Sequence, residues 1–190
     1  MSHKFDVKNR GKLDNQKRRE ILPPEETLKK LKLKKEDIMA DIGCGIGYFT
    51  IPAAKIVGNK GTVFALDISP QMLEEVKNKA AEENIQNIKT IRVNENDLKL
   101  QDETITYAFL SNILHEVENL EMFLKEIKRI VAPGGKIVII EWEKKVSDYG
   151  PPIHHRIDKH DLEVFLKNNE YRNLVHMNLG IDFYVITGEK

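Results

Sequence analysis

The sequence contains little of what stabilises secreted proteins or anchors proteins in membranes. Its 190 residues include a single cysteine, Cys44, so no intramolecular disulfide can form, and we expect a reducing, cytoplasmic location. No apolar run approaches the length of a membrane span, and the charged first residues do not resemble a signal peptide. These absences predict a soluble protein without a membrane partner.

The chain also lacks an excess of charge of either sign. Lysine and arginine total 30, and aspartate and glutamate total 30, so no overall field would draw the protein to nucleic acid or to an anionic membrane. Residues 1–37 are locally basic, with 12 basic and 7 acidic side chains. Such an arm more often packs on its own domain than binds RNA, and we expect no nucleic-acid partner.

Length and composition suit one compact domain. With 41% hydrophobic residues, the chain can bury a single core, and it is too short for two comfortable domains. We expect residues 37–190 to form this domain. Residues 1–36 are then an N-terminal arm and helix that cover the functional site.

The most informative feature that is present is a glycine-rich run from Asp41 to Gly47, with the sequence DIGCGIG. A short apolar segment precedes it, so a strand is expected to end here and a helix to begin. Glycines at alternate positions let the backbone adopt positive φ and approach a ligand closely. The carboxylate of Asp41 only accepts hydrogen bonds, which suits an ammonium or hydroxyl group better than a phosphate. The run therefore favours a zwitterionic ligand that carries a nucleoside.

Two alternatives compete with this interpretation. A dinucleotide fingerprint needs a third glycine three residues after the second, and Tyr48 stands at that position. An aspartate just before the loop would also repel a pyrophosphate at the helix N-terminus. The other alternative is a glycine turn that binds no ligand.

Hydrophobic patterning predicts strands that alternate with helices. Apolar runs bounded by turn residues predict parallel strands at residues 38–42, 62–67, 87–93, 105–110 and 136–142. Capping residues and apolar positions at helical spacing predict helices at residues 24–33, 48–57, from 70 onward, 120–131 and 158–167. The segment 132–135, with sequence APGG, predicts a turn.

The end of the chain predicts a different pairing. Strands near residues 171–177 and 181–187 are separated by only a few residues, which permits an antiparallel pair and excludes a parallel one. The fold class is therefore predicted as α/β, a Rossmann-like, doubly wound and mostly parallel seven-stranded sheet with a C-terminal antiparallel hairpin.

Two further residues stand where such a sheet binds ligands. Asp67 ends the second predicted strand, 20 residues after Gly47, where a carboxylate can accept hydrogen bonds from both ribose hydroxyls. His115 follows the fourth strand and could take a proton from a hydroxyl, thiol or amine. A helix cap or surface role for Asp67, and a capping or buried structural role for His115, are the alternatives.

The sequence DIGCGIG resembles the first signature of the class I S-adenosylmethionine-dependent methyltransferases, and the chain is most similar to their compact, small-molecule (type 11) members of ubiquinone and menaquinone biosynthesis. The resemblance spans about residues 35–142. It implies that the glycine loop passes under the methionine part of the cofactor and that Asp41 orients its amino group. It also implies that a residue after the third strand accepts from the adenine amino group. That place is taken by Asn94, whose carbonyl can still accept, and Asp97 is its rival.

The resemblance implies an enzyme that transfers a methyl group from S-adenosylmethionine to a small molecule, with His115 as the catalytic residue. The cofactor-binding residues that it implies are Asp41, Gly43, Cys44, Gly45, Gly47, Asp67, Ile68, Asn94, Glu95 and Ser111. Two other functions stay open: a regulatory or partner protein that binds S-adenosylmethionine without turnover, and an NAD(P)-dependent oxidoreductase. The sequence also leaves open whether the protein forms a homodimer.

The acceptor side carries no diagnostic motif. We expect it to be built from the N-terminal arm, the loop after the fourth strand and residues 150–160, with Phe5, Tyr48 and Phe49 as candidate lining residues. Trp142 and Glu143 could form pocket walls or pack in the core. The histidines at positions 154, 155 and 160 have poor spacing for a metal and no supporting ligand pattern, so no metal site is predicted.

Overall fold

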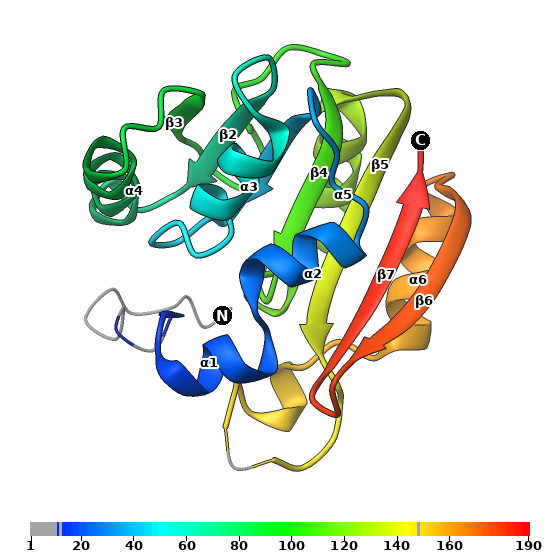
Figure 1. Cartoon of the computed structure of the whole chain (residues 1–190). Coiled ribbons are helices and arrows are strands. Elements are labelled where there is room, and N and C mark those ends of the chain that lie inside the picture. Colours follow the sequence, from blue (N-terminus) through cyan, green and yellow to red (C-terminus); the bar gives the residue numbers. More distant parts are fainter. Residues whose placement is uncertain (1–10, 12, 148) are drawn as a thin grey trace.

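The computed structural model describes residues 11, 13–147 and 149–190. Their central element is a seven-stranded mixed sheet (Figure 1). The strand order is β3-β2-β1-β4-β5-β7-β6. Five parallel strands run through β1 (Ile38–Ile42), β2 (Thr62–Asp67), β3 (Ile88–Arg92), β4 (Ile105–Ser111) and β5 (Val131–Trp142). Strand β7 (Phe183–Glu189) lies between β5 and β6 (Arg172–Leu179) and is antiparallel to both. The predicted fold class is confirmed.

Helices cover both faces of this sheet. One face carries α1 (Gln16–Ile21), α2 (Pro24–Lys30) and α3 (Thr50–Val57), with α4 (Pro70–Glu82) packed over β2 and β3. The other face carries α5 (Leu120–Ile130) and α6 (Lys159–Asn168). Alternate residues of a strand point to opposite faces, so β4 supplies Tyr107 and Phe109 to the first layer and Ala108 and Leu110 to the second. Both faces of the central strands are therefore buried, as their unbroken apolar sequences predict.

The element boundaries differ from the predicted ones in a few places. Helix α3 begins at Thr50 rather than at residue 48, because the glycine turn continues to Phe49. The two final strands each begin one or two residues later than predicted. Helix α1 was not predicted; it is only six residues long. It is capped by Asn15, the residue before it, whose side chain accepts a hydrogen bond from the Arg18 N–H at 2.9 Å.

Strand β5 begins earlier than expected. It starts at Val131, directly after α5, whereas the sequence predicted a turn at 132–135 and a strand from residue 136. The register explains the difference: Ile105 pairs with Val131, but Tyr107 pairs with Lys136. The intervening residues bulge out of the ladder, with Gly134 at a φ of 73°.

The topology brings distant residues to one edge. Because the five parallel strands all point the same way, their carboxyl ends meet, and a ligand site is expected there. In Figure 1 this is the end at which the arrows of β4 and β5 finish, and α1 and the loop after β5 lie at the same end. Among the described residues, no helix is long and apolar enough to cross a lipid bilayer.

Candidate active site

The glycine loop after β1 has the strained backbone that its sequence predicts. Gly43, Gly45 and Gly47 have φ values of 71°, 53° and 80°, a region that side chains other than glycine rarely adopt. The N–H groups of Gly43 and Cys44 both donate to the carbonyl of Leu66, at 2.8 and 3.0 Å, which ties the loop to β2. A Cβ at position 43 would lie 2.6 Å from Cγ2 of Ile113. The loop is thus pressed against the segment that follows β4.

Asp41 lies beneath this loop and is almost fully buried, with 3% of its surface exposed. Its Oδ2 accepts a hydrogen bond from the Thr50 hydroxyl at 2.6 Å. The pKa of Asp41 is raised from 3.8 to about 7. Burial is the largest cause and the charge of Asp67 adds to it, while the Thr50 hydrogen bond and the charge of Arg18 partly oppose the rise. Such a carboxyl group becomes fully charged when a cation binds beside it.

The raised pKa of Asp41 leads to a prediction about stability. Because the pKa in the folded state lies above that in the unfolded chain, the stability of the ligand-free protein should fall as pH rises from about 4 to 7. The slope from this group is at most about 1.4 kcal/mol per pH unit. Asp41→Asn should remove this slope, which denaturant unfolding of both proteins across that pH range would measure. Parallel pH profiles for the two proteins would contradict the assignment.

Asp67 links β2 to the glycine loop. Its Oδ2 accepts from the Gly45 N–H and its Oδ1 accepts from the Ser69 N–H, both at 2.8 Å. Burial raises the pKa of Asp67, and the backbone N–H groups oppose that rise. Each carboxylate oxygen has a second lone pair, so both can still accept from ribose hydroxyls. Asp67 also supports the cap of a helix, which was the alternative role for this residue. The Ser69 side chain caps α4, and Asp67 accepts a hydrogen bond from the Ser69 backbone N–H.

A cavity of about 380 Å³ opens beside Asp67 at the ends of β2 and β3. Three of the predicted cofactor-binding residues, Ile68, Asn94 and Glu95, line it together. Ile68 is 42% exposed and offers an apolar surface to a flat ring. The Asn94 Oδ1 accepts from the Asn96 N–H at 3.0 Å and keeps one lone pair. Asp97 does not line this cavity; its Oδ1 accepts from the Lys99 N–H.

His115 forms a buried pair with Glu141, a residue that sequence reasoning missed. His115 lies in a short 3₁₀ helix, Leu114–Glu116, and its Nδ1 is 3.0 Å from Oε2 of Glu141 at the end of β5. Glu141 is fully buried, and its Oε1 also accepts from the Leu114 N–H at 2.8 Å. Burial alone would lower the pKa of His115, but the hydrogen bond and the charges of Glu141 and Glu116 raise it. A carboxylate that accepts from Nδ1–H leaves Nε2 as the proton-accepting nitrogen.

The segment after β4 carries further polar groups to this edge. The Asn112 backbone has a φ of 58°, and its N–H donates to the Ile140 carbonyl at 2.8 Å. Its amide oxygen is buried and has no hydrogen-bond partner among the described residues. Ser111 lies beside it, with Oγ 3.4 Å from the Asn112 Nδ2. A buried acceptor without a donor is costly, so this oxygen is available to a ligand or to a water molecule.

Several predicted residues serve the packing instead. Cys44 is buried, and burial raises its pKa, which makes it an unreactive thiol that can contribute only shape and backbone groups. Tyr48 and Phe49 are 6% and 3% exposed and belong to the core cluster over α3. Trp142 packs on Phe183 with ring centroids 4.4 Å apart. Phe5 lies outside the described residues.

The loop between β5 and α6 is organised around one buried arginine. Arg156 is 4% exposed and uses all five of its N–H groups. It donates to the carbonyls of residues 143, 145, 149 and 151 and to the Ser147 hydroxyl, at 2.8–3.0 Å. This loop lies at the carboxyl edge, where the acceptor side was predicted. His154 and His155 in it contact each other edge to face, and the described residues contain no cluster of ligands that could hold a metal ion.

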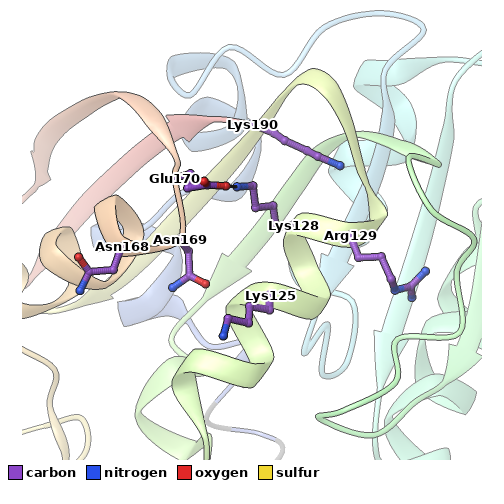
Figure 2. A pocket seen from close by; sticks show the side chains of 7 residues that line it. All are labelled: Lys125, Lys128, Arg129, Asn168, Asn169, Glu170 and Lys190. Atoms are coloured by element: carbon purple, nitrogen blue, oxygen red, sulfur yellow. Dashed lines mark hydrogen bonds and ion pairs between the residues drawn. The ribbon is translucent and has the colours of Figure 1, made fainter.

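A larger cavity, of about 480 Å³, lies elsewhere (Figure 2). It is lined by Lys125, Lys128, Arg129, Asn168, Asn169, Glu170 and Lys190. These residues surround the start of β5, at the edge of the sheet opposite to the glycine loop. Its cations already have acidic partners, including Lys128 with Glu170 at 2.7 Å and Arg129 with Asp102 at 2.6 Å. This cavity is therefore a poor anion site and takes no part in the arrangement described above.

Comparison with known proteins identifies the family of this chain. The family model described as "Methyltransferase domain" matches residues 40–139, just over half of the chain, from the glycine loop to β5. The chain belongs to this methyltransferase family. The predicted membership of the type 11 methyltransferases is thereby confirmed.

Individual methyltransferases are similar over different extents. A demethylmenaquinone methyltransferase of Geobacillus sp. (strain WCH70) is 35% identical over 124 residues, which are 65% of this chain and 53% of that protein. The chain thus spans about half the length of that relative. A SAM-dependent methyltransferase of Aquifex aeolicus has a TM-score of 0.92 and 29% identity, and the match covers 97% of this chain and 98% of that one. A phosphoethanolamine N-methyltransferase of Haemonchus contortus, at 14% identity and a TM-score of 0.75, shares the fold over 89% of this chain and 52% of its own.

Proposed function

We propose that this protein transfers a methyl group from S-adenosylmethionine to a small-molecule acceptor. One observation carries the proposal: three left-handed glycines join the buried Asp41 to the ribose-binding position of Asp67, beside a cavity that Ile68, Asn94 and Glu95 line. This order of groups matches a ligand with a cationic amino-acid end, a sugar and a flat base. The family membership supports the same conclusion.

The residues present fit this cofactor. The absence of side chains at Gly43, Gly45 and Gly47 leaves backbone surface for the methionine part, and a Cβ at position 43 could not be accommodated without moving Ile113. The buried, unpartnered amide oxygen of Asn112 offers an acceptor at the same edge. Asp67 would hold the ribose, and the cavity at Ile68 and Asn94 would hold the adenine.

When bound, the cofactor supplies an electrophilic methyl group on a sulfonium. The protein then has to align an acceptor with this group and exclude water, and alignment alone can contribute several orders of magnitude in rate. His115 is placed to take the proton that the acceptor loses, through Nε2, because Glu141 holds Nδ1. The His115 side chain is largely buried, with 9% of its surface exposed.

The match to the family model covers the proposed cofactor site but not the proposed acceptor side. The matched residues 40–139 contain the glycine loop, Asp67 and His115 but stop before the loop at 143–157. That loop, with Trp142 and Tyr149 in ring contact at 5.9 Å, forms the acceptor side in this proposal. We therefore propose a small molecule as the acceptor without transferring the quinone of the relatives to this chain.

Calorimetric titration with S-adenosylmethionine, S-adenosylhomocysteine and NADH tests the proposal. We expect affinity for the first two, with dissociation constants on the order of micromolar, and no binding of NADH. The affinity should weaken as pH falls through about 7, because Asp41 then becomes protonated. Binding of NADH alone, or of none of the three, would overturn the proposal. Binding of S-adenosylmethionine without methylation of any acceptor in a broad screen would favour a regulatory protein.

A further inference from the structure

The described part of the N-terminal arm, residues 11 and 13–36, contacts the glycine loop. A Cβ at Gly45 would be 3.2 Å from Cδ1 of Leu13, so the arm touches the loop at its midpoint. Tyr48, at the end of the same loop, donates its hydroxyl to the Leu22 carbonyl at 2.8 Å, and Leu22 is fully buried. Lys17 also lies 3.7 Å from the ring centre of Tyr149 in the loop after β5. Helix α1 is thus held between the two loops that border the site.

This helix brings one cation, Arg18, towards the site. Arg18 is half-buried, and its guanidinium lies 4.5 Å from the centre of the Tyr48 ring. Burial lowers the pKa of Arg18, although the charges of Asp14 and Asp41 favour its charged form. The guanidinium therefore lies over the Tyr48 ring, directly after the last glycine of the loop, and its charge lowers the pKa of the buried Asp41.

Arg18 has no anionic partner in the part of the chain that the structure describes. Its guanidinium forms neither an ion pair nor a hydrogen bond with the described residues, and its backbone N–H caps α1 instead. The neighbouring Arg19 differs, because it pairs with Asp14 at 2.6 Å and its side chain is 58% exposed. Removing a cation from water without an anion costs free energy, which a bound anion would recover.

We propose that Arg18 binds the α-carboxylate of the methionine part of S-adenosylmethionine. This inference rests on the proposed function. The amino-acid end of that ligand carries one ammonium and one carboxylate on the same carbon atom, so its two partners must be neighbours of opposite charge. Asp41 is buried beneath the glycine loop, and Arg18 lies over the Tyr48 ring at the end of that loop, so groups of opposite charge border the loop. Arginine suits this role because its planar guanidinium can donate two hydrogen bonds to one carboxylate.

The arm then becomes part of the cofactor site and contributes one of its charges. Asp41 and the glycine loop come from the core of the domain, whereas Arg18 comes from a helix that contacts the core through a few side chains. Binding of a ligand with a free carboxylate should therefore also hold α1 in place. A ligand without this group should bind without engaging the arm.

Calorimetry of the Arg18→Met variant tests this assignment. Methionine keeps the length and apolar stem of the side chain and removes the charge. The dissociation constants for S-adenosylmethionine and S-adenosylhomocysteine should rise by roughly 10- to 100-fold, the value of a lost charge-assisted hydrogen bond. Decarboxylated S-adenosylmethionine should bind the wild type and the variant equally. Arg18→Lys should recover part of the affinity, since it restores the charge.

Arg19→Met is the matched control, because it removes a neighbouring cation of the same helix that points to Asp14. It should leave all affinities unchanged. Unchanged affinity of Arg18→Met for S-adenosylmethionine would overturn the inference, and so would an equal loss for the decarboxylated ligand, which would indicate a general packing role for the arm. If the wild type binds none of these ligands, the proposed function itself is wrong.

Discussion

Replacing Gly43 with alanine should abolish S-adenosylmethionine binding and strongly destabilise the fold. The left-handed backbone costs a side chain about 1–2 kcal/mol, and the new Cβ would lie 2.6 Å from Ile113, an overlap whose relief costs about 1–3 kcal/mol more. Ile113 cannot retreat freely, because the adjacent Asn112 and Leu114 N–H groups are hydrogen-bonded to Ile140 and Glu141. Denaturant unfolding and calorimetry of the variant would measure both effects.

Gly134 provides the control for backbone strain. It has a φ of 73°, close to that of Gly43, but nothing lies within 4 Å of a Cβ placed there. Gly134→Ala should therefore lose only about 1–2 kcal/mol and should bind S-adenosylmethionine like the wild type. Equal losses of stability in the two variants would show that the contact with Ile113 has no energetic weight, and retained binding by Gly43→Ala would contradict the role of the loop.

Replacing Glu141 with alanine should reduce the stability of the fold by an amount similar to that expected for Gly43→Ala. Its carboxylate is fully buried and accepts from Leu114 and His115, so Glu141→Ala leaves two buried donors without a partner. Breaking such a buried pair costs about 3–5 kcal/mol. Glu143, two residues further along, is only half-buried and accepts no side-chain hydrogen bond in the described structure. Glu143→Ala should change stability by no more than about 0.5 kcal/mol.

The conservative variant Glu141→Gln separates the charge from the shape. The pKa of His115 is raised in the folded protein, so its charged form stabilises the fold at low pH, and this contribution disappears as pH rises through that pKa. The wild type should therefore exceed Glu141→Gln in stability most clearly below about pH 6, and the difference should shrink towards pH 8. An NMR titration should show a lower His115 pKa in the variant. An unchanged His115 pKa would mean that Glu141 does not act on the imidazole.

The residues of the proposed cofactor half could be named from the sequence because that half is local. This half needs only residues that lie close together in the sequence. They are the three glycines, the acidic residue before them and Asp67 at the end of the next strand. The alternating strands and helices also predicted a doubly wound, mostly parallel sheet, and the short final connection predicted the antiparallel β6–β7 pair. Local patterns of this kind survive tertiary packing because they are required by backbone geometry.

Contacts between residues of different strands, such as His115 with Glu141, could not be predicted from local patterns. His115 and Glu141 are 26 residues apart and meet only because β4 and β5 pair in parallel, with Ser111 opposite Ile140. A signal was present nonetheless: Glu141 is a charged residue inside the apolar run of β5, and a buried carboxylate requires donors. Helix α1 gave no such signal, because none of its residues is fully buried and no apolar stripe marks it.

The arginine-centred loop between β5 and α6 has a consequence for how this protein could change over evolution. Four of the five bonds from Arg156 go to backbone carbonyls, which every amino acid possesses, and only the Ser147 bond needs a particular side chain. Substitutions at the residues that offer Arg156 only a carbonyl can therefore change side chains of the proposed acceptor side and leave these backbone bonds in place. In that proposal, a change of substrate need not break the framework that holds the loop.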